Sequence, residues 1–142
     1  MSIVVRPFAI EDHTRVLALW AQCPGIGLND ADSRENIAAY LHRNPGMSFV
    51  AEADDTLVAA VLCGHDGRRG YLNHLAVLPP FRRRGLGRAL VQHCLEALRG
   101  AGVGKCHLFV FPENETALRF WQKIGWIQRT DLCIVSRLTE TP

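Results

Sequence analysis

The sequence lacks the long apolar runs of membrane proteins. Its longest apolar runs, such as the one from Val58 to Cys63, are far shorter than the roughly 20 residues that a transmembrane helix requires. Residues 1–5 do not show the basic segment and long apolar core of a secretory signal peptide. We therefore expect a cytoplasmic protein that has no membrane among its partners.

Charge of one sign is not in large excess either. The chain contains 16 lysines and arginines against 14 aspartates and glutamates, and its formal net charge is +2 at pH 7. Proteins that depend on attraction to a phosphate backbone usually carry a larger basic excess. We therefore expect no nucleic-acid partner, and any anion-binding site should be local.

Paired cysteine motifs are also absent. The five cysteines are scattered, odd in number and free of any C-x-x-C pair; they are Cys23, Cys63, Cys94, Cys106 and Cys133. This pattern is typical neither of a disulfide framework nor of a zinc site. The histidines are equally dispersed, so we predict buried thiols in a reducing cytoplasm and no metal ion.

What the sequence does contain is typical of one globular domain. Its 142 residues are 48% hydrophobic and 21% charged, and no repeat, low-complexity segment or linker divides them. We therefore predict a single domain over residues 1–142.

Hydrophobic periodicity and breaker residues predict a mixture of strands and helices. We expect strands over 2–8, 47–53, 57–64, 71–77, 105–111 and, as one or two strands, 126–138, and helices over 10–22, from Asp30 or Asp32 to His42, and over 85–100 and 114–124. This order predicts an α/β fold whose sheet is largely antiparallel, with one crossover in its second half.

The segment LAVLPPFRRRGLGRAL, residues 75–90, joins a predicted strand to a predicted helix. Unpaired main-chain N–H groups and the helix dipole concentrate at such a junction, and glycines let an anion approach the main chain closely. The arginines that can flank the anion are Arg82, Arg83, Arg84 and Arg88. The segment has neither P-loop spacing nor the third glycine of a dinucleotide fingerprint. By itself it leaves open a plain loop with solvated arginines.

Two motifs together resemble the GCN5-related N-acetyltransferases, the GNAT superfamily. NHLAVLPPFRRRGLGRALVQHCLEALRGAG (73–102) is similar to the acetyl-CoA-binding motif, and VFPENETALRFWQKIGW (110–126) is similar to the second motif. Both also look like the branch that acetylates the amino termini of ribosomal proteins. The resemblance implies an α/β GNAT fold with a mixed, mostly antiparallel twisted sheet of six or seven strands. About four helices would flank the sheet, and strands 71–77 and 105–111 would splay apart.

The resemblance also implies direct transfer of the acetyl group of acetyl-CoA to an amine. The main chain of Leu75, Ala76 and Val77 would pair with the pantetheine arm, and Asn114 would reach the end near the sulfur. The pyrophosphate would lie against the turn, whose residues are Arg82, Arg83, Arg84, Gly85, Leu86, Gly87 and Arg88. An amide near Val77 would polarise the thioester carbonyl, so no enzyme nucleophile is needed.

The chain departs from the family pattern at the acid and the base. Where many members have a tyrosine that protonates the leaving thiolate, this chain has Trp121, whose indole cannot titrate near neutrality. Where some relatives place a glutamate base, it has Phe109. Tyr71 as an acid and His74 as a base are the substitutes on strand 71–77. Strand alternation places His74 on the opposite face from Tyr71 unless a bulge intervenes, and water could relay the proton instead.

The acceptor remains open between a small-molecule amine and a peptide amino group. The segment 63–71, including His65 and Asp66, could form an acceptor-binding edge or a plain hairpin turn, and Asn29 and Asp30 could bind an amine. The empty acid and base positions keep a second hypothesis open, a non-catalytic acyl-CoA-binding sensor. The superfamily resemblance also makes a homodimer possible.

Overall fold

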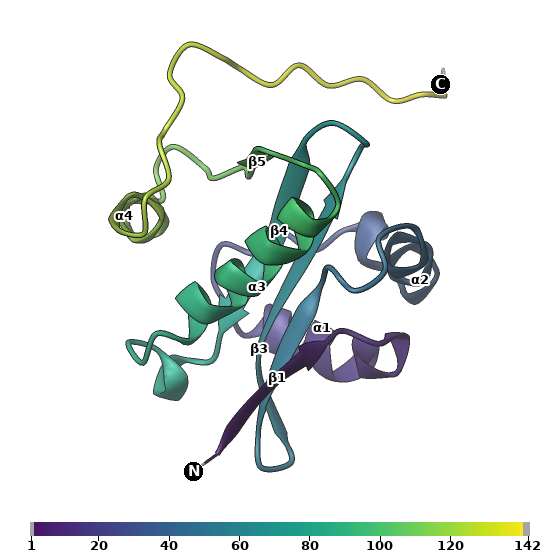
Figure 1. Ribbon diagram of the computed structural model, residues 1–142, viewed down its shortest axis with the longest axis vertical. Coiled ribbons are helices and arrows are strands. Elements are labelled where there is room, and N and C mark those ends of the chain that lie inside the picture. Colours follow the sequence, from purple (N-terminus) through teal and green to yellow (C-terminus); the bar gives the residue numbers. More distant parts are fainter. Residues whose placement is uncertain (1, 141–142) are drawn as a thin grey trace. The chain divides into compact units, whose positions relative to one another are not determined.

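Five strands form one mixed sheet in the first part of the chain (Figure 1). The computed structural model describes residues 2–140, which divide after Phe109 into two compact units that we describe separately. The strands are β1 (Ile3–Pro7), β2 (Phe49–Ala53), β3 (Thr56–His65), β4 (Gly70–Val77) and β5 (Cys106–His107). They lie side by side in chain order, with β1 to β4 antiparallel and β5 parallel to β4.

Three α-helices accompany this sheet, and they cover both of its faces. They are α1 (His13–Ala21), α2 (Arg34–Arg43) and α3 (Leu86–Gly100), and the short 3₁₀ helices are η1 (Ile10–Asp12), η2 (Asp30–Asp32) and η3 (Pro79–Phe81). A Cβ atom at Gly64 would meet Tyr40 of α2, whereas one at Gly70 would meet Leu98 of α3. Gly64 pairs with Tyr71, the neighbour of Gly70. Since successive strand residues point to opposite faces, α2 and α3 lie on opposite sides of the sheet.

The main core lies between α1 and the sheet. Its most buried members include Val16, Leu19 and Trp20 of α1 together with Ile37, Val50, Ala60 and Leu62. Burying a large apolar side chain contributes about 1.5–3 kcal/mol. This core therefore fixes α1 firmly against β3 and β4, where the site described below is built.

A β-bulge interrupts the pairing of β3 with β4. Leu62 pairs with Asn73 and Ala60 pairs with Ala76, so one residue of β3 faces both His74 and Leu75. His74 has a φ of +54°, which is unusual for a residue other than glycine. The strand is therefore bent and its side-chain alternation is shifted at His74.

Most elements expected before residue 105 are confirmed within two or three residues of their bounds. The second helix is an exception at its start, because Ser33, rather than Asp30 or Asp32, caps α2. The Ser33 hydroxyl accepts a hydrogen bond from Asn36 N at 3.1 Å. Asp30 and Asp32 form the preceding turn η2 instead.

The strand expected over 105–111 is much shorter than predicted. β5 pairs with β4 only at Gly70 with Cys106 and at Tyr71 with His107. The two strands part after Tyr71, which agrees with the predicted splay. Within residues 2–140, the segment 126–138 contains no strand, so the described sheet has five strands rather than six or seven. A β-strand requires a paired neighbour, and apolar composition alone does not supply one.

The second unit, from Val110 onward, contains α4 (Glu115–Lys123). Asn114 caps this helix, because its Oδ1 accepts a hydrogen bond from Ala117 N at 3.1 Å. The Trp121 ring packs edge-on against Phe120 and Trp126, at centroid distances of 5.1 and 5.0 Å. None of the helices in the described part of the chain is both long and apolar enough to cross a membrane.

Candidate active site

The bulge in β4 gathers three polar side chains on one face of the sheet. Tyr71 and Asn73 line a cavity together with Tyr40 of α2. His74 contacts Asp32 of η2, the turn that precedes α2 and packs against it. Regular alternation would have turned His74 away from Asn73. The bulge that the sequence analysis named as the exception is present, and it places His74 on the face of Tyr71.

His74 is held in place through both its ring and its main chain. Its Nε2 lies 3.0 Å from Asp32 Oδ1, and its carbonyl oxygen accepts a hydrogen bond from Trp20 Nε1 at 2.8 Å. The Trp20 ring meets the imidazole edge-on at 4.9 Å. These contacts stabilise the strained backbone of His74. Its side chain remains 20% exposed.

Asp32 is buried and fixed by its own neighbours. Its Oδ2 accepts a hydrogen bond from Asn29 N at 3.1 Å, and its carbonyl oxygen lies 2.9 Å from His13 Nε2. With Asp32 Oδ1 as the acceptor, His74 Nε2 carries the proton and Nδ1 is left as the basic nitrogen. A histidine oriented by a buried carboxylate can remove a proton from a bound amine. Sequence reasoning did not predict this contact between Asp32 and His74.

Tyr71 lies where β4 and β5 are still paired. Its ring stacks near Phe109 at 6.3 Å and approaches the ring of His107 at 5.9 Å. It therefore shares a face with Asn73 and lies at the point from which the two strands diverge. The structure thus brings both predicted catalytic residues, Tyr71 and His74, to the same side of β4.

The outer edge of β4 beyond Tyr71 has no strand beside it in the described residues. Ala76 and Val77 pair on the inner side with Ala60 and Ala59, and Leu75 belongs to the bulge. An extended ligand could therefore hydrogen-bond to the main chain of Leu75, Ala76 and Val77 as an added strand does. Asn114, the other residue predicted at this arm, lies in the second unit and caps α4.

The turn that follows β4 and η3 presents main-chain amides at the start of α3. Gly85 adopts the left-handed conformation with φ of +77°, and Arg83 also has a positive φ of +62°. Ala89 N donates to the Gly85 carbonyl, which is the first main-chain hydrogen bond of this helix. The amides of Leu86, Gly87 and Arg88 come before it, so they have no carbonyl partner within the helix. These amides and the helix dipole can bind a phosphate-type anion.

The arginines of this turn are exposed and surround the amides with positive charge. Arg82 Nε donates to the Val77 carbonyl at 2.8 Å, which ties the turn to the end of β4. The Arg84 guanidinium lies over the Phe81 ring at 5.5 Å. Arg83 and Arg88 complete the set. The donor set therefore fits a pyrophosphate group, the ligand predicted for this turn.

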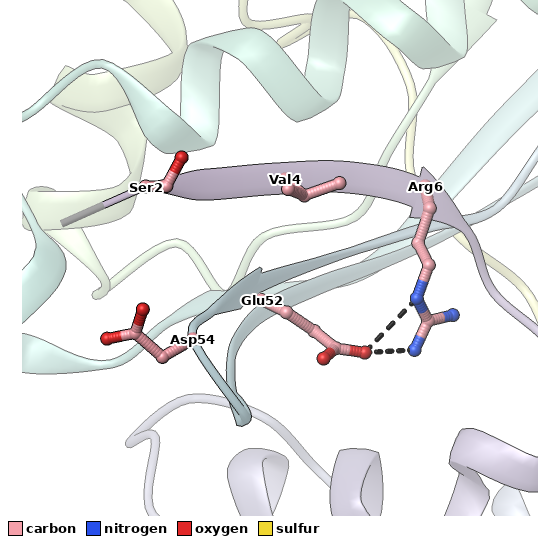
Figure 2. Close-up of a pocket in the computed structure, with 5 residues that line it drawn as sticks. All are labelled: Ser2, Val4, Arg6, Glu52 and Asp54. Atoms are coloured by element: carbon pink, nitrogen blue, oxygen red, sulfur yellow. Dashed lines mark hydrogen bonds and ion pairs between the residues drawn. The ribbon is translucent and has the colours of Figure 1, made fainter.

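A second charged cluster lies around the edge strand β1 and its neighbour β2 (Figure 2). Arg6 forms a two-point contact with Asp12 at 2.7 and 2.8 Å and also contacts Glu52. Arg15 bonds to the same two carboxylates at 3.1 and 3.3 Å. The hydrogen bonds from Arg6 lower the pKa of Glu52, which therefore remains ionised near neutrality. We assign this cluster to stability, and Glu52 is unsuited to carry a proton.

The variant Asp12→Asn is expected to be about 2 kcal/mol less stable than the wild type at pH 7, because charge-assisted hydrogen bonds are lost. Burial opposes ionisation of Asp12, but hydrogen bonds from Arg6 and Ala9 N lower its pKa overall. Its contribution is therefore complete above the unfolded pKa of about 3.9 and is lost as the pH falls through the lower folded value. Denaturant unfolding at a series of pH values measures this difference.

Asp54→Asn is the matched control, because Asp54 is an exposed turn residue with φ of +57°, a conformation that asparagine tolerates. Its stability should follow the wild type at every pH. A stability gap for Asp12→Asn that stays constant into strong acid would contradict the assignment of this effect to the Asp12 carboxylate.

The comparisons with known proteins agree with these features. The model of the acetyltransferase (GNAT) family matches residues 13–126. An acetyltransferase of Pectobacterium atrosepticum (strain SCRI 1043) is 31% identical over 137 residues, which are 96% of each chain. The PaiA N-acetyltransferase from Thermoplasma acidophilum, solved in complex with coenzyme A, has a TM-score of 0.76 at 22% identity, with 88% of this chain and 89% of that chain covered.

A further solved structure is AAC(6')-Iy in complex with the bisubstrate analogue CoA-S-monomethyl-acetylneamine. It has a TM-score of 0.76 at 20% identity and covers 97% of this chain and 99% of its own. At these identities the two structures show a shared fold, while the family match rests on sequence. The predicted superfamily is thereby confirmed: the chain belongs to the GNAT family of acetyltransferases and is an acetyl-CoA-dependent acyltransferase.

Proposed function

We propose that the chain transfers the acetyl group of acetyl-CoA to a primary amine, with His74 as general base and Asp32 as its positioning residue. The observation that carries this proposal is the 3.0 Å contact between His74 of β4 and Asp32 of η2. β4 leads directly into the cationic turn at the start of α3. A base and an anion-binding turn are thus attached to the two ends of one short main-chain segment, Leu75 to Val77.

The pyrophosphate of acetyl-CoA would bind to the amides at the start of α3 and to the arginines around them. The pantetheine arm would pair with the free edge of β4 along Leu75, Ala76 and Val77. The splay between β4 and β5 supports this placement, because it leaves that edge open. The PaiA protein and AAC(6')-Iy, with the same fold, were solved with coenzyme A and with a CoA-containing analogue.

The proposed reaction is a direct transfer. The amine nitrogen attacks the thioester carbonyl carbon, the new N–C bond forms, and the C–S bond to coenzyme A breaks. The proton of the amine passes to His74 Nδ1. Tyr71, on the same face of β4, is the proposed proton donor to the departing sulfur, the role that Trp121 cannot fill.

The alternative role for His74 is structural, as a histidine packed under a helix. The hypothesis of a non-catalytic sensor depends on this structural role. The buried carboxylate on Nε2 and the partial exposure of the His74 side chain favour the enzyme, because a general base needs both an orienting partner and access to the substrate. Three points stay predictions: which amine is the acceptor, the cytoplasmic location and the homodimer. AAC(6')-Iy was solved with an analogue of an acetylated small amine, so we place small amines first in the search.

Calorimetric titration with acetyl-CoA, run beside a thiol-release assay over amines and short peptides, tests the proposal. We expect saturable binding of acetyl-CoA and thiol release that depends on one class of amine. Binding without release on any amine would favour the sensor. The absence of binding would overturn both hypotheses.

A further inference from the structure

A cavity of about 210 Å³ is lined by Asn73, the residue that precedes the proposed base. Tyr40 and Arg43 of α2, Gly64 of β3, and Tyr71 and Asn73 of β4 line it. Tyr71 and Asn73 lie on the same face of β4 as His74, so the cavity opens on the side of the sheet that carries the proposed base. Its volume is several times the roughly 30 Å³ share of one water molecule, which suits a small organic group.

Tyr40 lines this cavity, and its buried hydroxyl has no hydrogen-bond partner within the described residues. Burial is the largest of the effects that raise the pKa of this phenol, so it stays neutral and keeps a hydrogen to donate. The Asn73 side chain lies close enough to lower the pKa of this phenol in part, but it forms no hydrogen bond with the hydroxyl in the described structure. A buried donor left unpaired costs about 1–3 kcal/mol, so an acceptor atom supplied by a ligand would be stabilising here.

Gly64 makes the space in which this hydroxyl lies. A Cβ atom at Gly64 would come within 2.7 Å of Tyr40 Oη and 2.6 Å of Asn44 Nδ2. Its φ is not in the left-handed region, so the glycine is needed here for space rather than for backbone conformation. The room around the two polar groups therefore depends on this single missing side chain.

Two hydrogen-bond donors at this cavity, the Tyr40 hydroxyl and the Arg43 guanidinium, come from α2. Arg43 is exposed and forms no ion pair within the described residues. Asp66, the carboxylate at the same cavity, is already engaged, because its Oδ1 accepts hydrogen bonds from Arg68 N and Arg69 N, both at 2.8 Å. Those bonds, from Arg69 N first, lower the pKa of Asp66.

We infer that this cavity binds a carboxylate of the acceptor, and that the acceptor is a small primary amine carrying a carboxylate, an amino-acid-like molecule. The inference rests on the proposed function, since it deepens that site. The Tyr40 hydroxyl and the Arg43 guanidinium would hold the carboxylate, and guanidinium groups match carboxylates well. The amine of the same molecule would then lie next to Asn73, toward His74.

Matched pairs of substrates test the inference. Phenylalanine and phenethylamine, or lysine and cadaverine, differ only by the carboxylate. We expect kcat/KM to be about 10-fold or more higher for the amino acid of each pair, because buried donors discriminate strongly against a ligand without their acceptor. Calorimetric titration of each amino acid into the protein saturated with coenzyme A gives a binding readout that does not require turnover.

Tyr40→Phe isolates the hydroxyl, because the ring and its packing are kept. It should reduce kcat/KM and affinity for the amino acid about 10-fold, leave the decarboxylated amine nearly unchanged, and leave the affinity for acetyl-CoA intact. Arg43→Gln should act in the same direction. Arg99→Gln, an exposed arginine at the end of α3 on the opposite face, is its matched control. Thermal melting identifies any variant that fails to fold.

The possible failures are distinguishable. Equal kcat/KM for both members of each pair, or a higher value for the amine without the carboxylate, would overturn the carboxylate assignment. Acetyl transfer itself would still stand. Equal effects of Tyr40→Phe on both members would also overturn it. Binding of acetyl-CoA without transfer to any amine or peptide would overturn the proposed function, and with it this inference.

Discussion

Replacing His74 with asparagine is expected to lower kcat/KM for the acceptor amine by about 10²–10⁴-fold, the contribution of a well-placed acid–base group. The variant loses the nitrogen that would accept the proton of the amine. Asparagine is the suitable replacement because His74 has a φ of +54°, which asparagine tolerates better than alanine does. Steady-state kinetics with the acceptor found in the thiol-release assay measures the effect.

Two further readouts separate catalysis from folding. His74→Asn should remove the rise of kcat/KM with pH that a general base produces, while the affinity for acetyl-CoA and the melting temperature stay near those of the wild type. His93→Asn, which changes an exposed histidine on α3, should keep the rise. If kcat/KM of His74→Asn still rises with pH as it does in the wild type, another group, or water, takes the proton.

Asp32→Asn tests the positioning residue. The amide keeps the size of the side chain and an oxygen, but it lacks the charge that stabilises a protonated imidazole. We expect kcat to fall by about 10-fold or more, with little change in KM for acetyl-CoA. A variant that loses stability, and whose kcat falls only in proportion to the fraction unfolded, would show that Asp32 has a structural role only.

The parts of the site that the sequence predicted are local in the chain. β4, the glycines of the turn and the start of α3 follow one another between residues 70 and 100, so strand pattern, turn residues and helix periodicity were sufficient to place them. Gly85 illustrates this, because the sequence predicted a helix that starts at about Gly85, and Gly85 is the left-handed N-cap of α3.

The relation between His74 and Asp32 could not be predicted in the same way. The two residues are 42 positions apart, and their contact depends on how η2 packs against the sheet. Whether His74 faces that side depends on a bulge, which is a property of the pairing between two strands. Asp32 precedes a helix, so its residue type indicated a cap, and Ser33 takes that role.

The segment 126–138 shows a different limit. Its apolar side chains predicted one or two strands, but Ile127, Val135 and Leu138 are strongly exposed and the segment pairs with no strand in the described residues. Strand propensity describes how a side chain fits a half-buried pleated surface. It cannot by itself predict that a neighbouring edge is available.

Replacing Gly85 with valine is expected to weaken the binding of acetyl-CoA by about 10-fold or more, because a β-branched residue is strained at φ of +77°. Strain of about 1–3 kcal/mol would be relieved by rearranging the turn, and the amides of Leu86 and Gly87 would then lose their common direction. Calorimetry with acetyl-CoA measures the loss directly, and it should appear without any acceptor amine.

Gly85→Asn is the matched control for this experiment. The space around a Cβ at Gly85 is open, since no heavy atom of the described residues, apart from its own chain neighbours, lies within 4 Å of it. Neither variant is therefore excluded by a clash. The two differ in backbone preference, because asparagine visits the left-handed region and valine rarely does. If both variants bind acetyl-CoA as the wild type does, the left-handed turn is dispensable, and exposed arginines such as Arg83 and Arg84 must carry the binding. In that case affinity should fall steeply with salt, whereas a contribution from oriented amides close to a bound pyrophosphate is screened much less.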